Sequence, residues 1–559
     1  MERIWLPRYP AGVPSDVDVG SCSSICEVFE KSTARFGPRT AFANMGTTLS
    51  YSELERLTRN FAAYLQADLK LPRGARVALM MPNVLQYPIA LFGILRAGCT
   101  AVNCNPLYTP RELRHQLADS GAQTLVVVEN FASVAEKALG STNVRHVIVT
   151  GLGDMLKFPT AWMVNSIVKY VKRLVPEWNL PAAVPFKVAL RSGARRSFER
   201  VAVQANDLAF LQYTGGTTGV PKGAMLSHGN LIANLEQAHA WLRPVLDEGR
   251  ETVVTALPLY HVFALTANCM LFLKIGATNV LITNPRDTSS FVKEWARQPV
   301  TAVTGVNTLF NLLLNDPDFA KLDFSALRVA VAGGMAVQRA VAERWKRVTK
   351  KALIEGYGLT ETSPFVAANP LDLADYNGSV GLPFPSTEIA IRDEEGHDLG
   401  VGEVGELCVR GPQVMKGYWN QPAETAKVMM ADGFLRTGDL ATVDNVGFVH
   451  IVDRKKDMII VSGFKVFPTE LEDVLAMCPG VREAAAFGVP DATSGQAVRV
   501  AVVKKDPSLT AEDVIRHCRE HLTAYKIPRF VEFRDELPKS SIGKVLRRAL
   551  AELSSQAVH

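Results

Sequence analysis

A loop rich in glycine and threonine, residues 213–224, constrains this chain more than any other dozen residues. It contains Lys222 and directly follows the strand-like run at 208–212. Glycines bring backbone N–H groups close to an anion, threonine hydroxyls add donors, and the lysine adds a mobile charge. The Walker A pattern fails in every register, because Gly223 stands where Ser or Thr should follow the lysine. The loop therefore predicts either a plain surface turn or a cradle that holds ATP for attack at a phosphorus other than the terminal one.

The length and composition describe a folded protein of several packed units. The chain has 559 residues, of which 47% are hydrophobic and 21% charged, so one small domain and a disordered chain are both excluded. A net charge of +5 does not indicate nucleic-acid binding, and it is compatible with anionic ligands or a lipid surface. The eight cysteines form no C-x-x-C pair or Cys/His cluster, which favours a reduced cytoplasm.

Helix-like and strand-like segments alternate along the first 385 residues. The strand-like runs include 75–80, 124–128 and 144–150. This alternation predicts an α/β fold with layered subdomains and mostly parallel sheets. Beyond residue 385, apolar and polar residues alternate between glycine turns, which indicates a small β subdomain. The last part reads as a compact α+β unit, so we expect a large N-terminal domain, 1–453, and a small C-terminal domain, 454–559.

One segment could contact a membrane, although no run of about 18 apolar residues could cross one and no signal peptide is visible. On a helix, one face of the segment would be apolar: Val164, Ile167, Val168, Val171, Leu174 and Val175. The opposite face would be polar and mostly cationic: Asn165, Lys169, Lys172 and Arg173. Trp162 and Trp178 flank the segment. Such a helix either lies in a membrane interface or packs against a core, and both interpretations stay open.

Four further clusters carry chemistry. Glu361 closes the glycine turn 356–361 and suits Mg²⁺ near phosphate oxygens, while Asp439 follows a glycine and suits ribose hydroxyls. The charged run 453–457 separates two differently patterned regions, which favours a hinge over a solvated face. Lys544 follows Ser and Gly in a loop before the last helix. Taken singly, each has an ordinary alternative as a turn carboxylate or a basic surface loop.

In this order and spacing the motifs resemble those of the adenylate-forming superfamily, which includes acyl-CoA ligases, peptide-synthetase adenylation domains and firefly-type luciferases. The matching segments are 213–224, 357–361, 437–439, Asp453-Arg454 and Gly543-Lys544. Within the superfamily the chain resembles most closely the bacterial long-chain fatty acid–CoA ligases, from 5–10 to 536–540. The resemblance implies an ATP-dependent, AMP-forming acid–thiol ligase.

The resemblance also implies two half-reactions and a set of site residues. A fatty carboxylate attacks the α-phosphorus of ATP, and the thiol of coenzyme A then displaces AMP from the acyl-adenylate. Positioning and electrostatics would carry the first step. The implied catalytic residues are Lys544, Thr360, Glu361 and His261. The implied nucleotide contacts are Thr214, Gly215, Gly216, Thr217, Thr218, Gly219, Lys222, Gly333, Gly334, Glu355, Tyr357, Gly358, Asp439 and Arg454, with Glu361 and Thr214 as Mg²⁺ ligands.

Two of these residues have open alternatives. His261 matches a position near the acyl-binding entrance of relatives, and a packed core histidine is the other interpretation. Glu355 stands where many relatives have glutamine, so its adenine contact stays open.

Relatives also rotate the C-terminal domain between the half-reactions. The matching hinge is Lys456, and the loop that would then face the centre and help to bind coenzyme A contains Gly463, Phe464 and Lys465. The positive charge of Lys544 would offset the negative oxygens of the carboxylate and the α-phosphate during adenylation. The same side chain would obstruct the thiol of coenzyme A during thioester formation.

The resemblance leaves two rival functions. One is an acyl-AMP ligase that loads a carrier protein, and the other is a fatty-acid-binding regulator without catalysis. The loop at 462–465 favours free coenzyme A, and intact Lys222, Glu361, Asp439 and Lys544 argue against a regulator. We expect a cytoplasmic enzyme of fatty acid activation and β-oxidation, with peripheral contact at the inner face of the cell membrane and no nucleic-acid partner. Chain-length preference and homodimer formation, which occurs in relatives, stay open.

Overall fold

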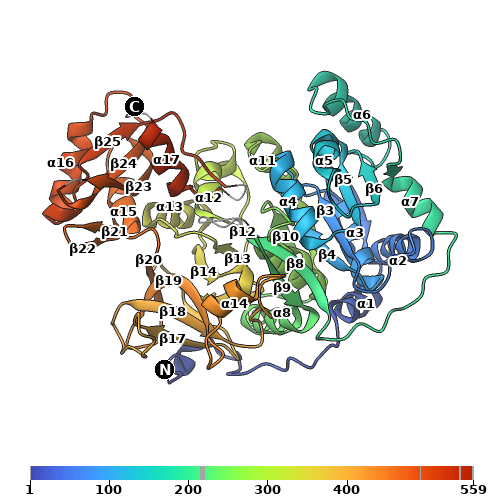
Figure 1. Cartoon of the computed structure of the whole chain (residues 1–559), viewed down its shortest axis with the longest axis horizontal. Helices are drawn as coiled ribbons and strands as arrows, with labels where there is room; N and C mark the ends of the chain where they lie inside the picture. Colours follow the sequence, from blue (N-terminus) through green and yellow to red (C-terminus); the bar gives the residue numbers. More distant parts are fainter. Residues whose placement is uncertain (1, 215–220, 492, 541–542, 557–559) are drawn as a thin grey trace.

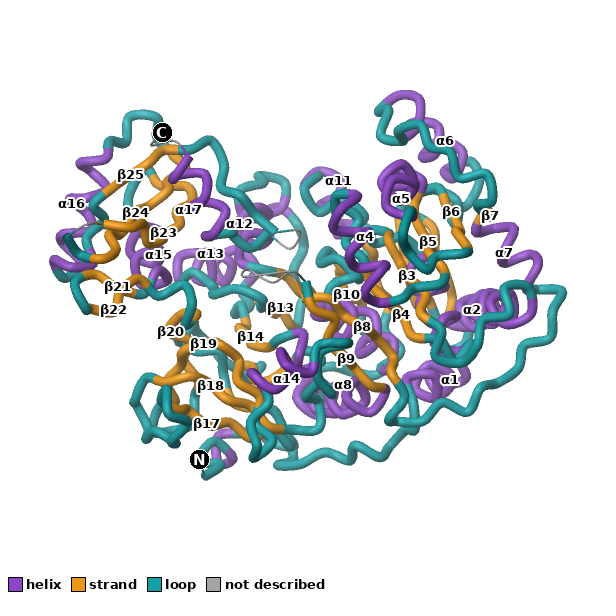
Figure 2. The backbone as a smooth tube through the Cα atoms, in the orientation of Figure 1, coloured by secondary structure: helices purple, strands orange, loops and turns teal. Residues whose placement is uncertain are grey.

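The structure is a computed structural model that describes residues 2–214, 221–491, 493–540 and 543–556. Two large sheets covered by helices form most of the molecule, and a small antiparallel sheet lies beside them (Figures 1 and 2). The C-terminal part, red in Figure 1, stands next to this body and is entered from β20 (Val449–Arg454). This is the layered α/β architecture with a small β unit that the alternating sequence pattern predicts.

The largest sheet brings together segments from the first 50 residues and from the middle of the chain. Its neighbouring strands are β16 (Leu382–Pro383), β15 (Phe365–Ala368), β14 (Ile354–Gly358), β13 (Val329–Ala332), β12 (Ala302–Gly305), β10 (Thr252–Thr255), β11 (Thr278–Leu281), β1 (Thr40–Asn44) and β2 (Thr47–Ser50). The central strands are parallel and buried on both faces, which explains their short, continuous apolar runs. β14 pairs in parallel with β13, so the loop after β14 emerges at the carboxyl edge, where α/β sheets place ligand sites.

The second sheet carries the glycine- and threonine-rich loop. Its order is β7 (Val184–Pro185), β6 (His146–Thr150), β5 (Thr124–Val128), β3 (Arg76–Met80), β4 (Thr100–Asn103), β8 (Leu208–Thr214) and β9 (Lys222–Ser227). β8 is parallel to β4 and antiparallel to β9, so the loop joins the two strands of a hairpin at the edge of the sheet. Thr214 and Lys222 are register partners at the end of this hairpin.

Two smaller sheets follow along the chain. The antiparallel sheet β17 (Glu388–Arg392), β18 (Gly405–Arg410), β19 (Leu435–Val443) and β20 confirms the predicted β unit. The C-terminal sheet consists of β21 (Ile459–Val461), β22 (Phe464–Val466), β23 (Val481–Asp491), β24 (Gly495–Lys504) and β25 (Phe530–Phe533). It has its own apolar core with α15 (Pro468–Met477) and α16 (Ala511–His521), separate from the main core of the N-terminal part. Separate cores let the two parts move as units.

Helices cover the sheets and begin at recognisable sequence signals. The main ones are α1 (Ile25–Phe36), α2 (Tyr51–Ala67), α3 (Gln86–Arg96), α4 (Pro110–Ser120), α5 (Ala132–Leu139), α7 (Phe186–Gly193), α8 (His228–Leu242), α11 (Thr288–Ala296), α12 (Asn307–Leu314), α13 (Arg339–Thr349), α14 (Pro422–Val428) and α17 (Arg547–Gln556). Capping boxes start α2 with Ser50 and Glu53 and α4 with Thr109 and Glu112, which satisfies the first free N–H groups of each helix.

The predicted amphipathic helix is shorter than expected and only part of it is helical. α6 (Thr160–Ser166) continues into one π-helical stretch, Ile167–Val171, and projects at the upper right of Figure 1. Leu174 and Val175 lie beyond the helix, so the single apolar face drawn from the sequence is wrong there. Asn165, predicted on the polar outer face, points inward, because its side chain accepts the Gly153 N–H at 2.7 Å. The local loop therefore decides which face of α6 is covered.

Candidate active site

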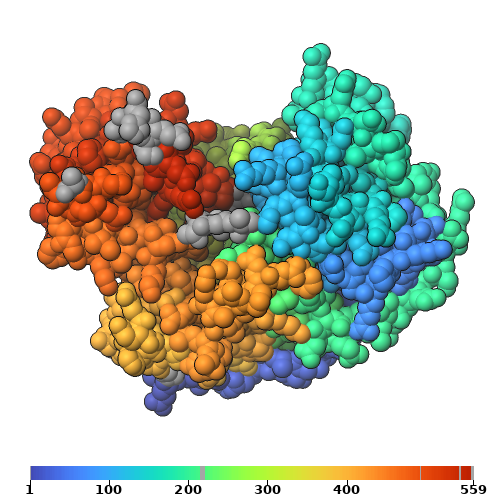
Figure 3. All heavy atoms as spheres, in the orientation of Figure 1, coloured from blue at the N-terminus to red at the C-terminus, as the bar shows by residue number. Residues whose placement is uncertain are grey.

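A cavity of about 1230 Å³ lies where the large sheets, the β17–β20 sheet and the C-terminal part meet. Its wall includes Thr214 at the end of β8, Glu361 after β14, Arg454 at the end of β20 and Lys544 just before α17. In Figure 3 the red C-terminal part and the blue-green N-terminal part stand on either side of this region. Residues separated by more than 300 positions in the chain therefore share one site.

The hairpin β8–β9 supplies one cationic corner of the cavity. The ammonium of Lys222 forms an ion pair with Glu424 of α14 and lies 5.1 Å from the ring centroid of Tyr418. Lys222 and then Lys427 hold the pKa of the Glu424 carboxyl at about 2, well below its ordinary value. The five predicted contacts Gly215, Gly216, Thr217, Thr218 and Gly219 lie outside the described residues. The described ends of the loop thus place a hydroxyl and a restrained lysine at this corner.

Glu361 lies near this corner, in the single turn Thr360–Thr362 that follows β14, because Tyr418 contacts both Glu361 and Lys222. The Tyr418 hydroxyl donates to its carboxylate at 2.8 Å. Gly358, just before the turn, has no room for a side chain, because a Cβ there would meet the Pro364 carbonyl oxygen at 1.9 Å. The carboxylate of Glu361 and the hydroxyl of Thr214 are hard oxygen donors, so the residues present fit Mg²⁺.

Tyr357 and Arg454 line the next part of the wall, and Asp439 lies behind them in contact with both. The Tyr357 hydroxyl donates to Asp439 at 2.6 Å, and Arg454 Nε contacts the other oxygen of that carboxylate at 3.1 Å. Asp439 and Arg454 meet because they are register partners in β19 and β20. Desolvation, and then the negative charge of Asp439, raise the pKa of Tyr357 well above its ordinary value, so the hydroxyl remains a donor. The group presents fixed polar atoms beside Gly333 and Gly334.

Lys544 and His261 both line the cavity, and the charge of Lys544 acts on the His261 ring. Desolvation lowers the pKa of Lys544 to about 8, and the charge of Arg454 adds to the effect. Desolvation also lowers the pKa of His261 to about 4, with a contribution from the charge of Lys544. The Phe263 N–H approaches His261 Nδ1 at 3.4 Å, which leaves the proton of the neutral ring on Nε2. The cavity lining therefore combines the ammonium of Lys544 with the neutral ring of His261, a hydrogen-bond donor.

The loop that carries Lys544 is seated directly on the N-terminal part. Gly543 has a φ of 86°, and a Cβ at this position would lie 2.5 Å from the Thr308 hydroxyl of α12. Thr308 donates to the Gly543 carbonyl at 3.4 Å. Only glycine combines this positive φ with so close an approach, so Gly543 lets the lysine enter the cavity.

From this centre an apolar arm of the cavity runs between α8 and the largest sheet. Residues of the arm include Trp241, Ala267, Leu271, Phe272, Ala302 and Leu371. Trp241 is held in place because its indole N–H donates to the Asn369 carbonyl at 3.1 Å. Ala267 and Leu271 belong to a π-helical stretch, Leu265–Leu271, a geometry that often marks functional sites. The cavity thus combines a polar, partly cationic end with an apolar end.

Comparison with protein-family models identifies this architecture. Residues 29–419 match the model described as AMP-binding enzyme, and residues 470–544 match the AMP-binding enzyme C-terminal domain. The chain belongs to the AMP-binding enzyme family. The two matched regions contain Thr214, His261 and Glu361 on one side and Lys544 on the other.

Curated relatives and solved structures agree with this AMP-binding enzyme assignment. The chain is 58% identical to the long-chain-fatty-acid–CoA ligase of Yersinia pestis, over 99% of this chain and 98% of that protein. It is 54% identical to the enzyme of the same name from Haemophilus influenzae, over 99% and 98%. The benzoate CoA ligase of Burkholderia xenovorans has a TM-score of 0.81 at 26% identity, covering 95% of this chain and 100% of that one. ATP-bound MatB of Rhodopseudomonas palustris has a TM-score of 0.79 at 27% identity, covering 96% and 100%.

The AMP-binding enzyme cavity collects many of the predicted site residues. The predicted site residues that line it are Thr214, Lys222, His261, Gly333, Gly334, Tyr357, Gly358, Thr360, Glu361, Arg454, Lys456 and Lys544. Asp439 lies just behind this lining, bonded to Tyr357 and Arg454. Glu355 is buried outside it, where its carboxyl accepts the Val337 N–H at 3.0 Å and burial raises its pKa to about 8.

Three other predicted residues lie outside the cavity lining, and two residues that the sequence analysis missed lie within it. Gly463, Phe464 and Lys465 are not among the lining residues. The ring of Phe464 stacks on the ring of Tyr525, within the C-terminal part, with 4.7 Å between the ring centroids. Tyr418 and Glu424 contact Glu361 and Lys222 but carry no motif that the sequence analysis could recognise.

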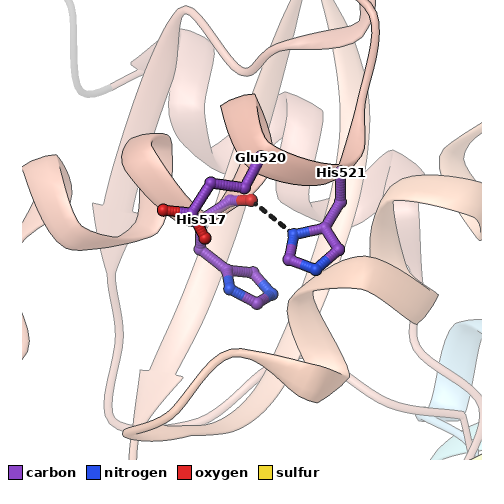
Figure 4. A group of neighbouring side chains, drawn as sticks. All are labelled: His517, Glu520 and His521. Carbon is purple, nitrogen blue, oxygen red and sulfur yellow. Dashed lines mark hydrogen bonds between the residues drawn. The ribbon is translucent and has the colours of Figure 1, made fainter.

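A second cluster of candidate metal ligands lies on α16, away from the AMP-binding enzyme cavity (Figure 4). His517, Glu520 and His521 each offer one ligand atom within 4.8 Å of the others. One ring nitrogen of His517 contacts the Val474 carbonyl at 3.0 Å, and His521 Nδ1 contacts the His517 carbonyl at 2.9 Å. These contacts already satisfy one nitrogen of each ring, and none of the three residues lines the cavity.

Proposed function

We infer that this protein is a long-chain fatty acid–CoA ligase, which converts ATP, a fatty acid and coenzyme A into acyl-CoA, AMP and diphosphate through an acyl-adenylate. The observation that carries this inference is one shared cavity whose lining combines Lys544 and His261 with charged residues and with the apolar residues of the arm. The full-length relatives at 54–58% identity, all named long-chain-fatty-acid–CoA ligase, support the same reaction. The match of residues 29–419 to the AMP-binding enzyme model supports the use of a nucleotide in this reaction.

For the first half-reaction we propose that the polar end holds ATP with its α-phosphorus toward the apolar arm. Lys222 and Thr214 would bind the β- and γ-phosphates, together with the undescribed glycine and threonine residues between them. Glu361, with Thr214, would hold Mg²⁺, which neutralises charge on the phosphate oxygens when bound. The supporting observation is that these groups already face one corner of the cavity.

The nucleoside would lie against the glycine-lined wall. Asp439 and Arg454 would bind the ribose, Tyr357 would pack beside the adenine, and Thr360 would contact the α-phosphate. The hydrogen bond between Tyr357 and Asp439 keeps both side chains in one orientation before the nucleotide arrives, which reduces the entropic cost of binding.

Lys544 and His261 would align the fatty carboxylate with the phosphorus. The ammonium of Lys544 offsets the repulsion between the carboxylate and the α-phosphate oxygens. The neutral ring of His261 adds a hydrogen-bond donor without a second positive charge, since its lowered pKa keeps it uncharged at pH 7. The alkyl chain would occupy the arm past Ala267 and Leu271.

For the second half-reaction we propose that the C-terminal domain, 454–559, rotates on the N-terminal domain, 1–453, about Lys456. Rotation would withdraw Lys544 and bring Gly463, Phe464 and Lys465 to the centre, where they would guide the thiol of coenzyme A. The exposed position of Phe464 away from the cavity supports this, because it leaves the loop free to act in another arrangement.

The test of the proposed function is a measurement of AMP and acyl-CoA release across saturated fatty acids of increasing length. We expect both products in equal amounts, with higher kcat/KM for long chains because a longer alkyl chain buries more surface against the apolar residues of the arm. Release of acyl-adenylate without acyl-CoA would indicate an acyl-AMP ligase instead. Fatty-acid binding with no AMP formed would refute catalysis altogether.

We also propose that residues 157–174 contact the inner face of the cell membrane. No helix within the described residues is long and apolar enough to cross a bilayer. In this segment, however, Phe158 is 86%, Trp162 67%, Tyr170 71% and Val171 75% exposed, an unusual density of apolar surface. Lys169, Lys172 and Arg173 stand beside them, which suits an anionic lipid surface.

Sedimentation with phosphatidylglycerol vesicles tests this contact. The triple variant Trp162→Ala, Tyr170→Ala, Val171→Ala should bind at least about tenfold more weakly, because each side chain would lose its burial in the interface. Leu107→Ala is the matched control, since Leu107 is equally exposed at 64% elsewhere on the N-terminal part. Equal vesicle binding by wild type and triple variant would contradict the proposal.

A further inference from the structure

The carboxylate of Asp453 is buried at the point where the two parts of the chain meet. It belongs to β20, where Asp453 pairs with Leu440 of β19, so the small sheet of the N-terminal part fixes its backbone. Its side chain is only 1% exposed. One oxygen accepts the Thr469 N–H at 2.8 Å, and the other contacts Arg547 Nη1 at 3.1 Å. Both partners come from the far side of the proposed hinge.

The contact with Thr469 provides a helix cap across the hinge. α15 begins at Pro468, and its N-cap residue, Phe467, has no side chain that could accept a hydrogen bond. The first N–H groups of a helix have no partner within the helix. Asp453 supplies the acceptor from another element, and its negative charge also suits the positive end of the helix. The cap of α15 is therefore borrowed from the N-terminal part.

Arg547 completes the connection, and the C-terminal part holds its guanidinium almost entirely. Nε and Nη2 bind the two oxygens of Glu472 at 2.9 and 2.7 Å. Nη1 contacts Asp457 at 3.2 Å, and Nη2 contacts the Thr469 hydroxyl at 3.3 Å. Of these acceptors, only Asp453 precedes Lys456. A rotation about Lys456 would carry Arg547 away with its other partners and leave Asp453 behind.

The same arginine lies close to the catalytic loop. Lys544 stands three residues before Arg547, in a turn where Ser540 N–H donates to the Lys544 carbonyl at 2.7 Å. A bridge between Lys539 and Val545 closes the base of this turn. Holding Arg547 against Asp453 therefore also holds the turn that places Lys544 in the cavity.

We propose that Asp453 and Arg547 form a latch that holds the adenylating arrangement and breaks when the C-terminal domain rotates. The proposal rests on the two-arrangement mechanism of the proposed function. Both residues are positioning residues: neither lines the cavity, and they act through the placement of Lys544. Without the latch, the population of molecules with Lys544 in the cavity falls, while the arrangement for thioester formation gains.

The test compares the two half-reactions in one variant. Asp453→Asn keeps the size of the side chain and an acceptor for Thr469, but removes the charge that binds Arg547. We expect the fatty-acid-dependent exchange of diphosphate into ATP to fall by about tenfold or more. Formation of acyl-CoA from supplied acyl-adenylate should be unchanged or faster. Arg547→Lys, which keeps the charge but loses the planar fork, should shift the ratio of the two rates in the same direction.

Lys539→Gln is the matched control. Lys539 lies on the same loop as Lys544 and forms an ion pair with Glu483 of β23 at 2.7 Å, so both partners lie on the C-terminal side of the hinge. It should leave the ratio of the two rates as in wild type. Equal losses in both half-reactions for Asp453→Asn, at an unchanged melting temperature, would overturn the latch. Absence of acyl-CoA formation by the wild type would instead overturn the proposed function, so the two failures are distinguishable.

Hydrogen exchange in the wild type keeps the proposal testable if both variants fold poorly. The probe is a peptide that spans the start of α15, measured with a non-hydrolysable acyl-adenylate analogue alone and then with coenzyme A added. The Thr469 amide should exchange faster after coenzyme A is added, because its cap on Asp453 is lost. Unchanged exchange at this amide, in enzyme that turns over, would overturn the latch.

Discussion

Raising the pH above about 8 is expected to slow the first half-reaction by removing the proton of Lys544. Desolvation, and then the charge of Arg454, lower the pKa of this ammonium to about 8. With that value about nine tenths of the free enzyme carries the charged lysine at pH 7, and about one tenth at pH 9. Because kcat/KM reports the free enzyme, its value for adenylation should fall about tenfold over this interval.

Unfolding does not account for such a fall. The pKa of Lys544 is lower in the folded protein than the ordinary value of an unfolded chain, so between these two values the unfolded state binds more protons. The contribution of this lysine to the free energy of unfolding therefore increases as the pH rises above about 8. Thermal melting at each pH separates this effect from lost catalysis.

Fatty-acid-dependent exchange of labelled diphosphate into ATP measures the step from about pH 6.5 to about 9.5. Lys544→Arg keeps a cation throughout, so its residual exchange should not vary across the range. Lys544→Ala should lose about 10²- to 10³-fold in exchange, yet retain thioester formation from supplied acyl-adenylate. A wild-type rate that stays flat to the top of the range, or a parallel fall in Lys544→Arg, would refute the reasoning.

Three further changes have defined expectations. Tyr357→Phe leaves the buried Asp439 without its 2.6 Å donor and should raise the KM for ATP about tenfold, with little change in the KM for fatty acid. Ala302→Leu, in the apolar arm, should lower kcat/KM for long chains by about fourfold for each methylene that no longer fits, while a short-chain acid is spared. Trp345→Ala removes a fully buried ring packed on Phe310 and should lower the free energy of unfolding by about 3–5 kcal/mol in denaturant titration, assayed beside a wild-type control.

Much of the fold was predictable because short apolar runs that alternate with helical periodicity have few other solutions. The runs at 124–128 and 75–80 became the buried parallel strands β5 and β3, paired with each other. The resemblance to a family with ordered motifs also predicts one site for Asp439, Arg454 and Lys544, which local patterns alone do not connect.

The remaining features depend on contacts that no local pattern encodes. Glu424 became the partner of Lys222 because α14 lies beside the β8–β9 hairpin, although the two residues are 202 positions apart in the chain. Asn165 turned inward because Gly153 offers it an N–H, an interaction that outweighs the amphipathic pattern. Arg547 carries no motif that the sequence analysis could recognise, and only the folded arrangement brings its guanidinium to the carboxylates of Asp453, Asp457 and Glu472.

The ion pair between Lys222 and Glu424 has a consequence for the departure of the product. On the proposed function, an incoming polyphosphate would have to displace the Glu424 carboxylate, so binding at this corner would exchange one anion for another. The displaced carboxylate stays tethered to α14 and keeps competing for the same ammonium. Once the bond to the α-phosphorus is broken, we expect this competition to help expel diphosphate and to discourage the reverse reaction.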